Sequence, residues 1–294
     1  MLVEANGVRL WFDVDGAELV PDGREMRARP TVVLVHGGPG GHDHSYFKPD
    51  FARLTDVAQV VYLDLRDHGR SARHDPADWN FELCADDVRA FCDVVGITRP
   101  IVFGHSMGGM IALLYAARHP GHAGGLILQS TMSRFDLDRL VEGVRKVAGD
   151  DVAELARREY SDGSTTDSEW AAVFAAFGPR VPDDAQLARR TRNPELIGYG
   201  MNLLCAFDAA DAASGIACPT LVCVGRLAPV TPVAAAQETY DALPAELAHL
   251  EIVEEAGHFP WLDVPDSYWP IIKAFVVSAK DRNEQSRTPI GSGA

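Results

Sequence analysis

The sequence lacks several features that would assign it to a particular class of protein. Its first residues, MLVEANGVRLWFDVDG, have neither the basic start nor the apolar run of a signal peptide, and no later stretch is long and apolar enough to span a bilayer. No run of lysine and arginine reverses the net charge of −15 locally, so a phosphate backbone would be repelled. We therefore expect a cytoplasmic protein that has neither membrane nor nucleic acid as a partner.

Cysteine is scarce, and its spacing suits neither metal binding nor a disulfide framework. The five cysteines, Cys84, Cys92, Cys205, Cys218 and Cys223, are an odd number, and four of them lie in apolar stretches. We expect reduced, buried thiols. Low complexity is confined to the polar end of the chain, so residues 281–294 are predicted to form a disordered tail.

What the sequence does have is the alternation of strands and helices typical of a parallel α/β protein. Short apolar runs, as expected for strands buried on both faces, recur as TVVLV, AQVVYLDL, PIVF, GGLILQ, PTLVCV and HLEIV. Helical patterns such as FELCADDVRAFCDVVG separate them, and the Asn6-Gly7 turn predicts a hairpin at the start. The predicted fold class is α/β, with a mainly parallel sheet flanked by helices.

One segment interrupts this alternation. Between residues 133 and 214 only helical patterns occur, and strand-type runs resume at PTLVCV. We interpret residues 133–214 as a helical cap inserted between two strands of a core made of residues 1–132 and 215–280.

The motif GHSMGG carries the strongest chemical information. It matches Gly-x-Ser-x-Gly, and it lies between an apolar strand and a helical pattern, which is the context of a nucleophile elbow. Gly104 and Gly108 would let the strand and the helix approach closely. We expect Ser106 to be the nucleophile and the backbone N–H of Met107 to stabilise an oxyanion.

Two further segments supply the partners that such a serine needs. HGGPG follows the strand TVVLV, and Gly38 is our candidate for the second oxyanion N–H, because it has no side chain to obstruct a substrate. VEEAGHFPW places His258 after a strand near the C-terminus, where the general base is expected. His42 and His44 form a His-x-His pair, but two ligands without a third favour pocket lining over a metal site.

These motifs, together with DLRDHGRS and the inserted helices, resemble the α/β-hydrolase superfamily over roughly residues 2–278. HGGPGG resembles the proline-iminopeptidase branch. The elbow and the Asp64-Leu65-Arg66 loop are more similar to esterases and lactonases. The resemblance implies a two-step acyl transfer on a small-molecule substrate, without a metal or organic cofactor; it leaves the oligomeric state open.

The carboxylate that should orient the base is missing. The resemblance places an aspartate in a Gly-x-x-Asp-x-x-x-Pro pattern, and between Gly225 and Pro232 that position holds Ala228. A methyl group can neither accept the Nδ1–H of the base nor stabilise an imidazolium. Because the rest of the motif is intact, we favour an impaired hydrolase, and we expect an unfilled space beside Ala228.

Ala228 is also compatible with a relocated acid or with a protein that has lost its catalysis. An acid could have moved to the end of the preceding strand, but LILQSTMSRFD offers Gln129, Ser130 and Thr131 and no carboxylate before Asp136. Without an acid anywhere, the protein could be a ligand-binding pseudoenzyme.

The substrate class depends on the cap and on residues beside the base. We predict that the pocket is lined by aromatic and histidine side chains: His105, Phe259, Trp261, Trp170 and Tyr199. An ester or lactone is the favoured substrate. An iminopeptidase-like aminopeptidase is the alternative, because it would use cap carboxylates to hold an ammonium group, and the candidates are Glu142, Glu154, Glu159, Glu169 and Glu195.

Overall fold

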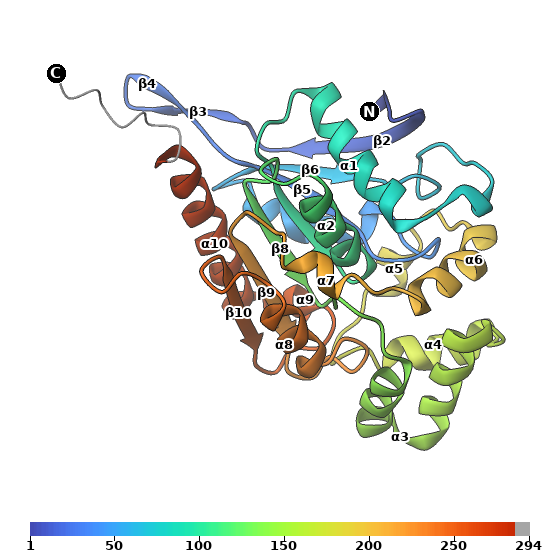
Figure 1. Cartoon of the computed structure of the whole chain (residues 1–294). Coiled ribbons are helices and arrows are strands. Elements are labelled where there is room, and N and C mark those ends of the chain that lie inside the picture. The colour runs from blue at the N-terminus through green and yellow to red at the C-terminus, as the bar shows by residue number, and fades with distance from the viewer. Residues whose placement is uncertain (286–294) are drawn as a thin grey trace.

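An eight-stranded sheet runs through the centre of the protein, and helices cover both of its faces (Figure 1). The computed structural model describes residues 1–285. The strand order is β1-β2-β6-β5-β7-β8-β9-β10; β2 pairs antiparallel with β1 and β6, and all other neighbours are parallel. The strands are β1 (Leu2–Ala5), β2 (Val8–Asp15), β5 (Thr31–Val35), β6 (Gln59–Leu63), β7 (Ile101–His105), β8 (Gly125–Gln129), β9 (Thr220–Gly225) and β10 (Ala248–Val253).

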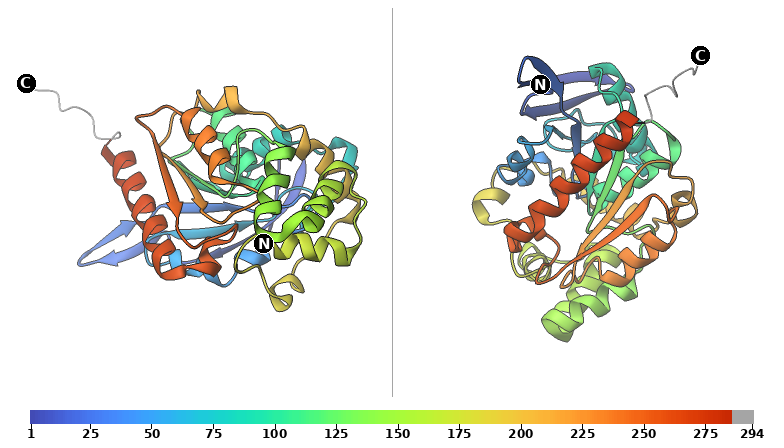
Figure 2. Two further views of the ribbon diagram at one scale, coloured as in Figure 1. Left: turned by 90° about the horizontal axis from the view of Figure 1, so that it is seen from below. Right: turned by 90° about the vertical axis from the view of Figure 1, so that its left-hand side faces the viewer.

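The two faces of the sheet bury separate hydrophobic cores. Strand β5 divides its side chains between them, with Val33 and Val35 in one core and Val32 and Leu34 in the other, as the two-residue period of a strand requires. The first core is covered by α1 (Phe81–Val95), α2 (Met107–Arg118) and α8 (Val233–Asp241). The second is covered by the 3₁₀ helices η1 (His44–Phe47) and η2 (Asp50–Leu54) and by α9 (Pro260–Asp263) and α10 (Pro265–Gln285), and Figure 2 shows α10 running along that face.

Local sequence features set several of these boundaries. Asn6 and Gly7 both have positive φ (49° and 72°) and join β1 to β2, which confirms the predicted hairpin. Helix α1 begins after Asn80, whose side chain accepts from Leu83 N, and ends at Gly96 in the left-handed conformation.

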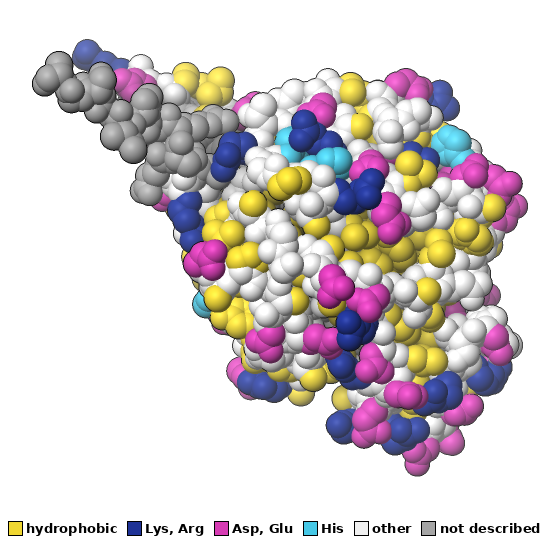
Figure 3. All heavy atoms as spheres, viewed as in Figure 1, with side chains coloured by type: hydrophobic (Ala, Val, Ile, Leu, Met, Phe, Trp, Pro, Cys, Tyr) yellow, Lys and Arg dark blue, Asp and Glu magenta, His cyan; other side chains and the backbone are white. Residues whose placement is uncertain are grey.

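All the elements between β8 and β9 are helices. They are α3 (Leu137–Asp162), α4 (Asp167–Ala175), α5 (Asp184–Leu187), α6 (Pro194–Cys205) and α7 (Ala210–Ala213), and α3 is kinked at Gly149. Side chains of both charges gather over α3 and α4 at the lower right of Figure 3. The sequence patterns predicted these helices, and we call them the cap below.

The structure adds a hairpin to the N-terminal part of the core and corrects one expectation about its C-terminal end. Before β5, β3 (Leu19–Asp22) and β4 (Glu25–Ala28) form a small antiparallel hairpin. The predicted disordered tail begins too early, because α10 continues to Gln285; residues 286–294 lie outside the described part of the chain. A short 3₁₀ helix, η3 (Pro76–Asp78), precedes α1.

The described residues contain no helix long and apolar enough to cross a membrane. All five cysteines are free, and Cys205 alone among them is partly exposed.

Candidate active site

Ser106 lies on a sharp turn between β7 and α2. Its backbone has φ 55° and ψ −125°, a conformation that is rare for a residue with a side chain. Two hydrogen bonds hold this turn: Ser106 N donates to Gln129 O (3.0 Å), and Thr131 Oγ1 donates to Ser106 O (2.7 Å). A strained turn fixed in this way, in front of a helix N-terminus, is the geometry of a nucleophile elbow.

The glycines of GHSMGG are required by close backbone contacts. A Cβ on Gly104 would lie 2.3 Å from Gly108 O, and a Cβ on Gly108 would lie 2.1 Å from Val35 O. Neither contact can be relieved by turning a side chain, because each involves backbone atoms. The strand and the helix therefore approach as the sequence predicted.

Two backbone N–H groups near Ser106 are free to meet a ligand. Among the described residues, no hydrogen bond uses the N–H of Gly38 or of Met107, whereas Gly37 N donates to Tyr46 OH (2.9 Å). Gly38 lines the same cavity as Ser106, with φ 142°. Both groups were predicted as oxyanion donors, and their unused N–H groups fit that role.

His258 is buried, and its Nδ1 faces a hydroxyl where a carboxylate was expected. Thr231 Oγ1 lies 3.1 Å from His258 Nδ1. Burial lowers the pKa of His258 well below 6.5, and the neighbouring His105 and His42 lower it further. No carboxylate of the described residues opposes this shift. The histidine is thus a neutral imidazole oriented by Thr231.

The structure contains no substitute acid on the neighbouring strand. Gln129, at the end of β8, accepts from Tyr268 OH and donates to Ser130 Oγ. Asp136 caps α3 by accepting from Arg139 N (2.9 Å). The unfilled space expected beside Ala228 is also missing from the cavities next to Ser106, because Ala228 is buried in the core and lines neither of them.

A chain of buried hydrogen bonds links the HGGPG loop to the backbone of His258. Gly37 N donates to Tyr46 OH, which lies 2.9 Å from His105 Nδ1, and His105 Nε2 lies 3.0 Å from His258 O. Because a carbonyl only accepts, His105 carries its proton on Nε2, and its Nδ1 accepts from Tyr46. Burial lowers the pKa of His105 to about 3, so this direction is maintained at neutral pH.

The cap completes the site by contacting His258 directly. His258 N donates to Phe177 O (2.9 Å), and the Phe177 ring meets the His258 ring edge to face at 5.3 Å. Gly178 and Gly257 pass so closely that a Cβ on Gly257 would lie 2.3 Å from Gly178 Cα. Ser106, His258 and the cap enclose a cavity of about 230 Å³. No hydrogen bond joins Ser106 to His258 within the described residues.

Three of the residues predicted to line the pocket lie in the wall of the cavity, and two lie outside it. His105, Phe259 and Trp170 line it. Trp261 does not, because its fully buried ring packs beneath the site against His105 at 4.9 Å. Tyr199 does not either, because its hydroxyl donates to Ala77 O (3.1 Å) in η3, which is not part of the cavity wall.

Several residues of the cavity were not predicted from the sequence. Tyr46, Phe174, Arg190 and Arg192 line it, as does His42, which was considered only as one of a histidine pair. Of the five cap glutamates considered for an ammonium group, only Glu159 reaches the cavity, and it accepts a hydrogen bond from Thr165 Oγ1.

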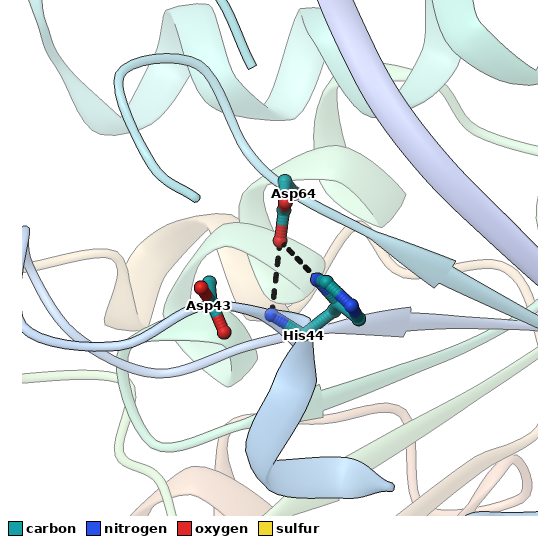
Figure 4. A group of neighbouring side chains, drawn as sticks. All are labelled: Asp43, His44 and Asp64. Atoms are coloured by element: carbon teal, nitrogen blue, oxygen red, sulfur yellow. Dashed lines mark hydrogen bonds and ion pairs between the residues drawn. The ribbon is translucent and has the colours of Figure 1, made fainter. Parts of the chain in front are cut away.

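Asp43, His44 and Asp64 form a buried cluster beside the site (Figure 4). His44 contributes both its Nδ1 (2.8 Å) and its backbone N (2.9 Å) to Asp64 Oδ1. The other carboxylate oxygens also accept backbone N–H groups, from Arg70, Ser45 and Thr191. The cluster is internally satisfied, so it serves as a structural network that fixes the segment after HGGPG.

Comparison with known proteins decides the family. A family model described as the alpha/beta hydrolase fold matches residues 30–265. The chain is an α/β hydrolase. It is 24% identical over 255 residues to the pimeloyl-[acyl-carrier protein] methyl ester esterase of Vibrio campbellii, covering 84% of this chain and 94% of that protein. It is 23% identical over 265 residues to the proline iminopeptidase of Heyndrickxia coagulans, covering 84% of this chain and 90% of that protein.

Solved structures agree on the fold of this α/β hydrolase. The enol-lactonase from Burkholderia xenovorans LB400 superposes with a TM-score of 0.66 at 24% identity, over 94% of this chain and 100% of that one. The relatives are thus hydrolases of esters, lactones and amides, as the sequence resemblance implied.

Proposed function

We propose that this α/β hydrolase cleaves a small-molecule ester or lactone through an acyl-enzyme on Ser106, and that Ala228 impairs its turnover. The observation that carries the proposal is the strained turn of Ser106, which lines one cavity with His258 and Gly38. Esterase and lactonase relatives support the reaction class.

In the proposed reaction, His258 carries its proton on Nδ1, where Thr231 Oγ1 accepts it, and its Nε2 removes the proton of Ser106 Oγ. Ser106 Oγ attacks the carbonyl carbon, and the N–H groups of Gly38 and Met107 stabilise the oxyanion. The protonated His258 then donates to the leaving alkoxide. Water, activated by the same histidine, releases the acid and regenerates Ser106.

The slow turnover that we propose follows from the group that faces His258 Nδ1, which is the Thr231 hydroxyl. A threonine hydroxyl can fix the imidazole tautomer, but it bears no charge to stabilise the imidazolium that forms in the transition state. The low pKa of buried His258 adds to this, because a weaker base removes the serine proton less readily.

Substrate class is tested on the Ala228→Asp variant with p-nitrophenyl esters, lactones and proline p-nitroanilide. We expect hydrolysis of esters or lactones and none of the proline amide, and Ser106→Ala should abolish all activity. Hydrolysis of the proline amide alone would favour the aminopeptidase, for which Glu159 is the cavity carboxylate. If Ser106 also failed to react with a fluorophosphonate, the protein would be a binder and the proposal would be wrong.

Thr231→Val tests the orienting hydroxyl in the natural chain. Removing the partner of Nδ1 should slow fluorophosphonate labelling of Ser106 by about tenfold, roughly the value of one lost hydrogen bond. The same change should have little effect in the Ala228→Asp background, because the introduced carboxylate would then hold Nδ1. Equal losses in both backgrounds would mean that Thr231 acts only by packing.

A further inference from the structure

Arg190 reaches the catalytic cavity without a counter-ion. Its side chain is half-buried and lines the cavity, yet it makes no ion pair or hydrogen bond with any described residue. Burial and the neighbouring Arg192 lower the pKa of its guanidinium, and the attraction of Asp43, which forms no ion pair with it, opposes this shift only in part. A half-buried cation without an ion pair is unfavourable in the cavity wall unless a ligand supplies a negative charge.

The backbone around Arg190 is fixed to the HGGPG region on both sides. Thr191 N donates to Asp43 Oδ2 (2.7 Å), and Asn193 N donates to Gly40 O (2.8 Å). Asn193 Nδ2 also donates to Asp67 O (2.9 Å). The arginine is therefore presented by a segment anchored beside the predicted oxyanion loop, which reduces the ordering that a ligand would require.

His42 offers a second unused polar group in the same cavity. Its Nδ1 is buried and has no hydrogen-bond partner among the described residues. The centroid of its ring lies 5.4 Å from that of Tyr46 and 5.9 Å from that of Phe174, and these two rings limit the rotation of the imidazole. Buried polar atoms are seldom left unsatisfied in proteins, so this nitrogen also indicates a missing ligand atom.

The cavity is also lined by two carboxylates of the cap, but these are better satisfied without a ligand. Glu159 already accepts a hydrogen bond from Thr165, and Asp167 is exposed to solvent. The groups left without a partner are thus Arg190 and His42, and both can donate to an anion.

We propose that Arg190 and His42 bind a carboxylate of the substrate, so that the ester cleaved at Ser106 is a half-ester of a dicarboxylic acid or a carboxylated lactone. The planar guanidinium of Arg190 can pair with a carboxylate through two parallel N–H···O bonds, and the imidazole of His42 can add a third. The bond that breaks is the ester bond of the proposed function, on which this inference rests; the bound carboxylate takes no part in the chemistry.

The kinetic test uses two esters of equal length on the Ala228→Asp protein: monomethyl adipate, which is anionic, and methyl hexanoate, which is neutral. Arg190→Gln should raise KM for monomethyl adipate by about tenfold and change KM for methyl hexanoate much less. Arg189→Gln is the matched control, because this exposed neighbour contacts Lys48 O and does not line the cavity. Equal effects on both esters, or no preference for the anion in the parent, would overturn the proposal.

A binding test separates this inference from the proposed function. Adipate, which cannot be hydrolysed, should bind the natural chain in calorimetry, and Arg190→Gln should weaken that binding by about tenfold while Arg189→Gln leaves it intact. Adipate binding without any esterase activity would contradict the proposed function but support the anion site. Absence of adipate binding, or binding of prolinamide in its place, would refute the anion site whatever the esterase result.

Discussion

Ala228→Asp is expected to raise kcat/KM for ester hydrolysis by about 10²- to 10⁴-fold. In chymotrypsin, replacing the equivalent acid by its amide lowers turnover by about 10⁴. Here Thr231 already orients the imidazole, so part of that loss has been recovered in the natural chain. The measurement is initial-rate hydrolysis of the preferred p-nitrophenyl ester by the natural and substituted proteins.

Ala228→Asn is the matched control for this gain. The amide has nearly the size of the carboxylate but no charge, so it should give little of the increase. A rise of the same size in both variants would mean that side-chain volume, and not charge, limits the natural chain. No rise in a folded Ala228→Asp protein would contradict the proposal that the missing acid impairs turnover.

The pH dependence of the two proteins gives a second readout of the same change. The base must be neutral to act, so activity falls as the pH decreases through the pKa of His258 in the free enzyme. Burial holds that pKa well below 6.5, so the natural chain should keep its relative activity into the acid range. A carboxylate at residue 228 would stabilise the imidazolium and raise the pKa. The acidic limb of kcat/KM should therefore move to higher pH in Ala228→Asp.

The features that could be predicted from the sequence are those fixed by local backbone constraints. Gly104 has no space for a Cβ because Gly108 O, four residues later in the chain, would lie 2.3 Å from it, so part of the GHSMGG pattern reflects the turn itself. The hydrophobic runs likewise reflect burial on both sides of the sheet, which depends only on the strand's own residues.

The parts that could not be predicted arise from contacts between distant segments. Thr231 differs from other threonines only because its hydroxyl meets His258 in the folded chain. Arg190 looks like a surface residue in a charged segment until the Asp43 and Gly40 contacts of the following residues bring it to the cavity. Trp261 was misplaced because its proximity to His258 in the sequence does not specify which side of the backbone its ring occupies.

The aromatic and histidine surroundings of the site explain how His258 is kept in place without a carboxylate at its Nδ1. His105 connects the backbone of His258 to Tyr46, and through it to Gly37. The base and the predicted oxyanion loop are therefore positioned by one buried network, whichever residue faces Nδ1. Because these hydrogen bonds position His258 without using a charged partner, Ser106 and His258 can keep their geometry without an aspartate.

Arg66→Met is expected to lower the free energy of unfolding by about 3–5 kcal/mol. Arg66 pairs with Asp87 through two hydrogen bonds of 2.5 and 2.6 Å, and the Asp87 side chain is 1% exposed. Removing the guanidinium leaves a buried charge with no ionic partner. The His68 ring, which accepts from Gly40 N, also bonds to Arg66 O, so the loss should extend to the HGGPG loop. Chemical denaturation measures the change.

The double variant Arg66→Met/Asp87→Leu identifies the cause of that loss. If an uncompensated charge is responsible, removing the carboxylate as well should restore most of the stability, because apolar pairs often replace buried ion pairs without penalty. Asn6, which also donates to Asp87, is exposed and can bond to water instead. In the single variant, Arg66 no longer opposes the effect of burial, so the pKa of Asp87 in the folded protein should rise further. The folded state would then bind a proton more readily than the unfolded state. The free energy of unfolding of the single variant should therefore increase as the pH falls towards the ordinary pKa of a carboxyl group. Equal instability of the single and double variants, without this pH dependence, would mean that Arg66 acts through packing and not through charge.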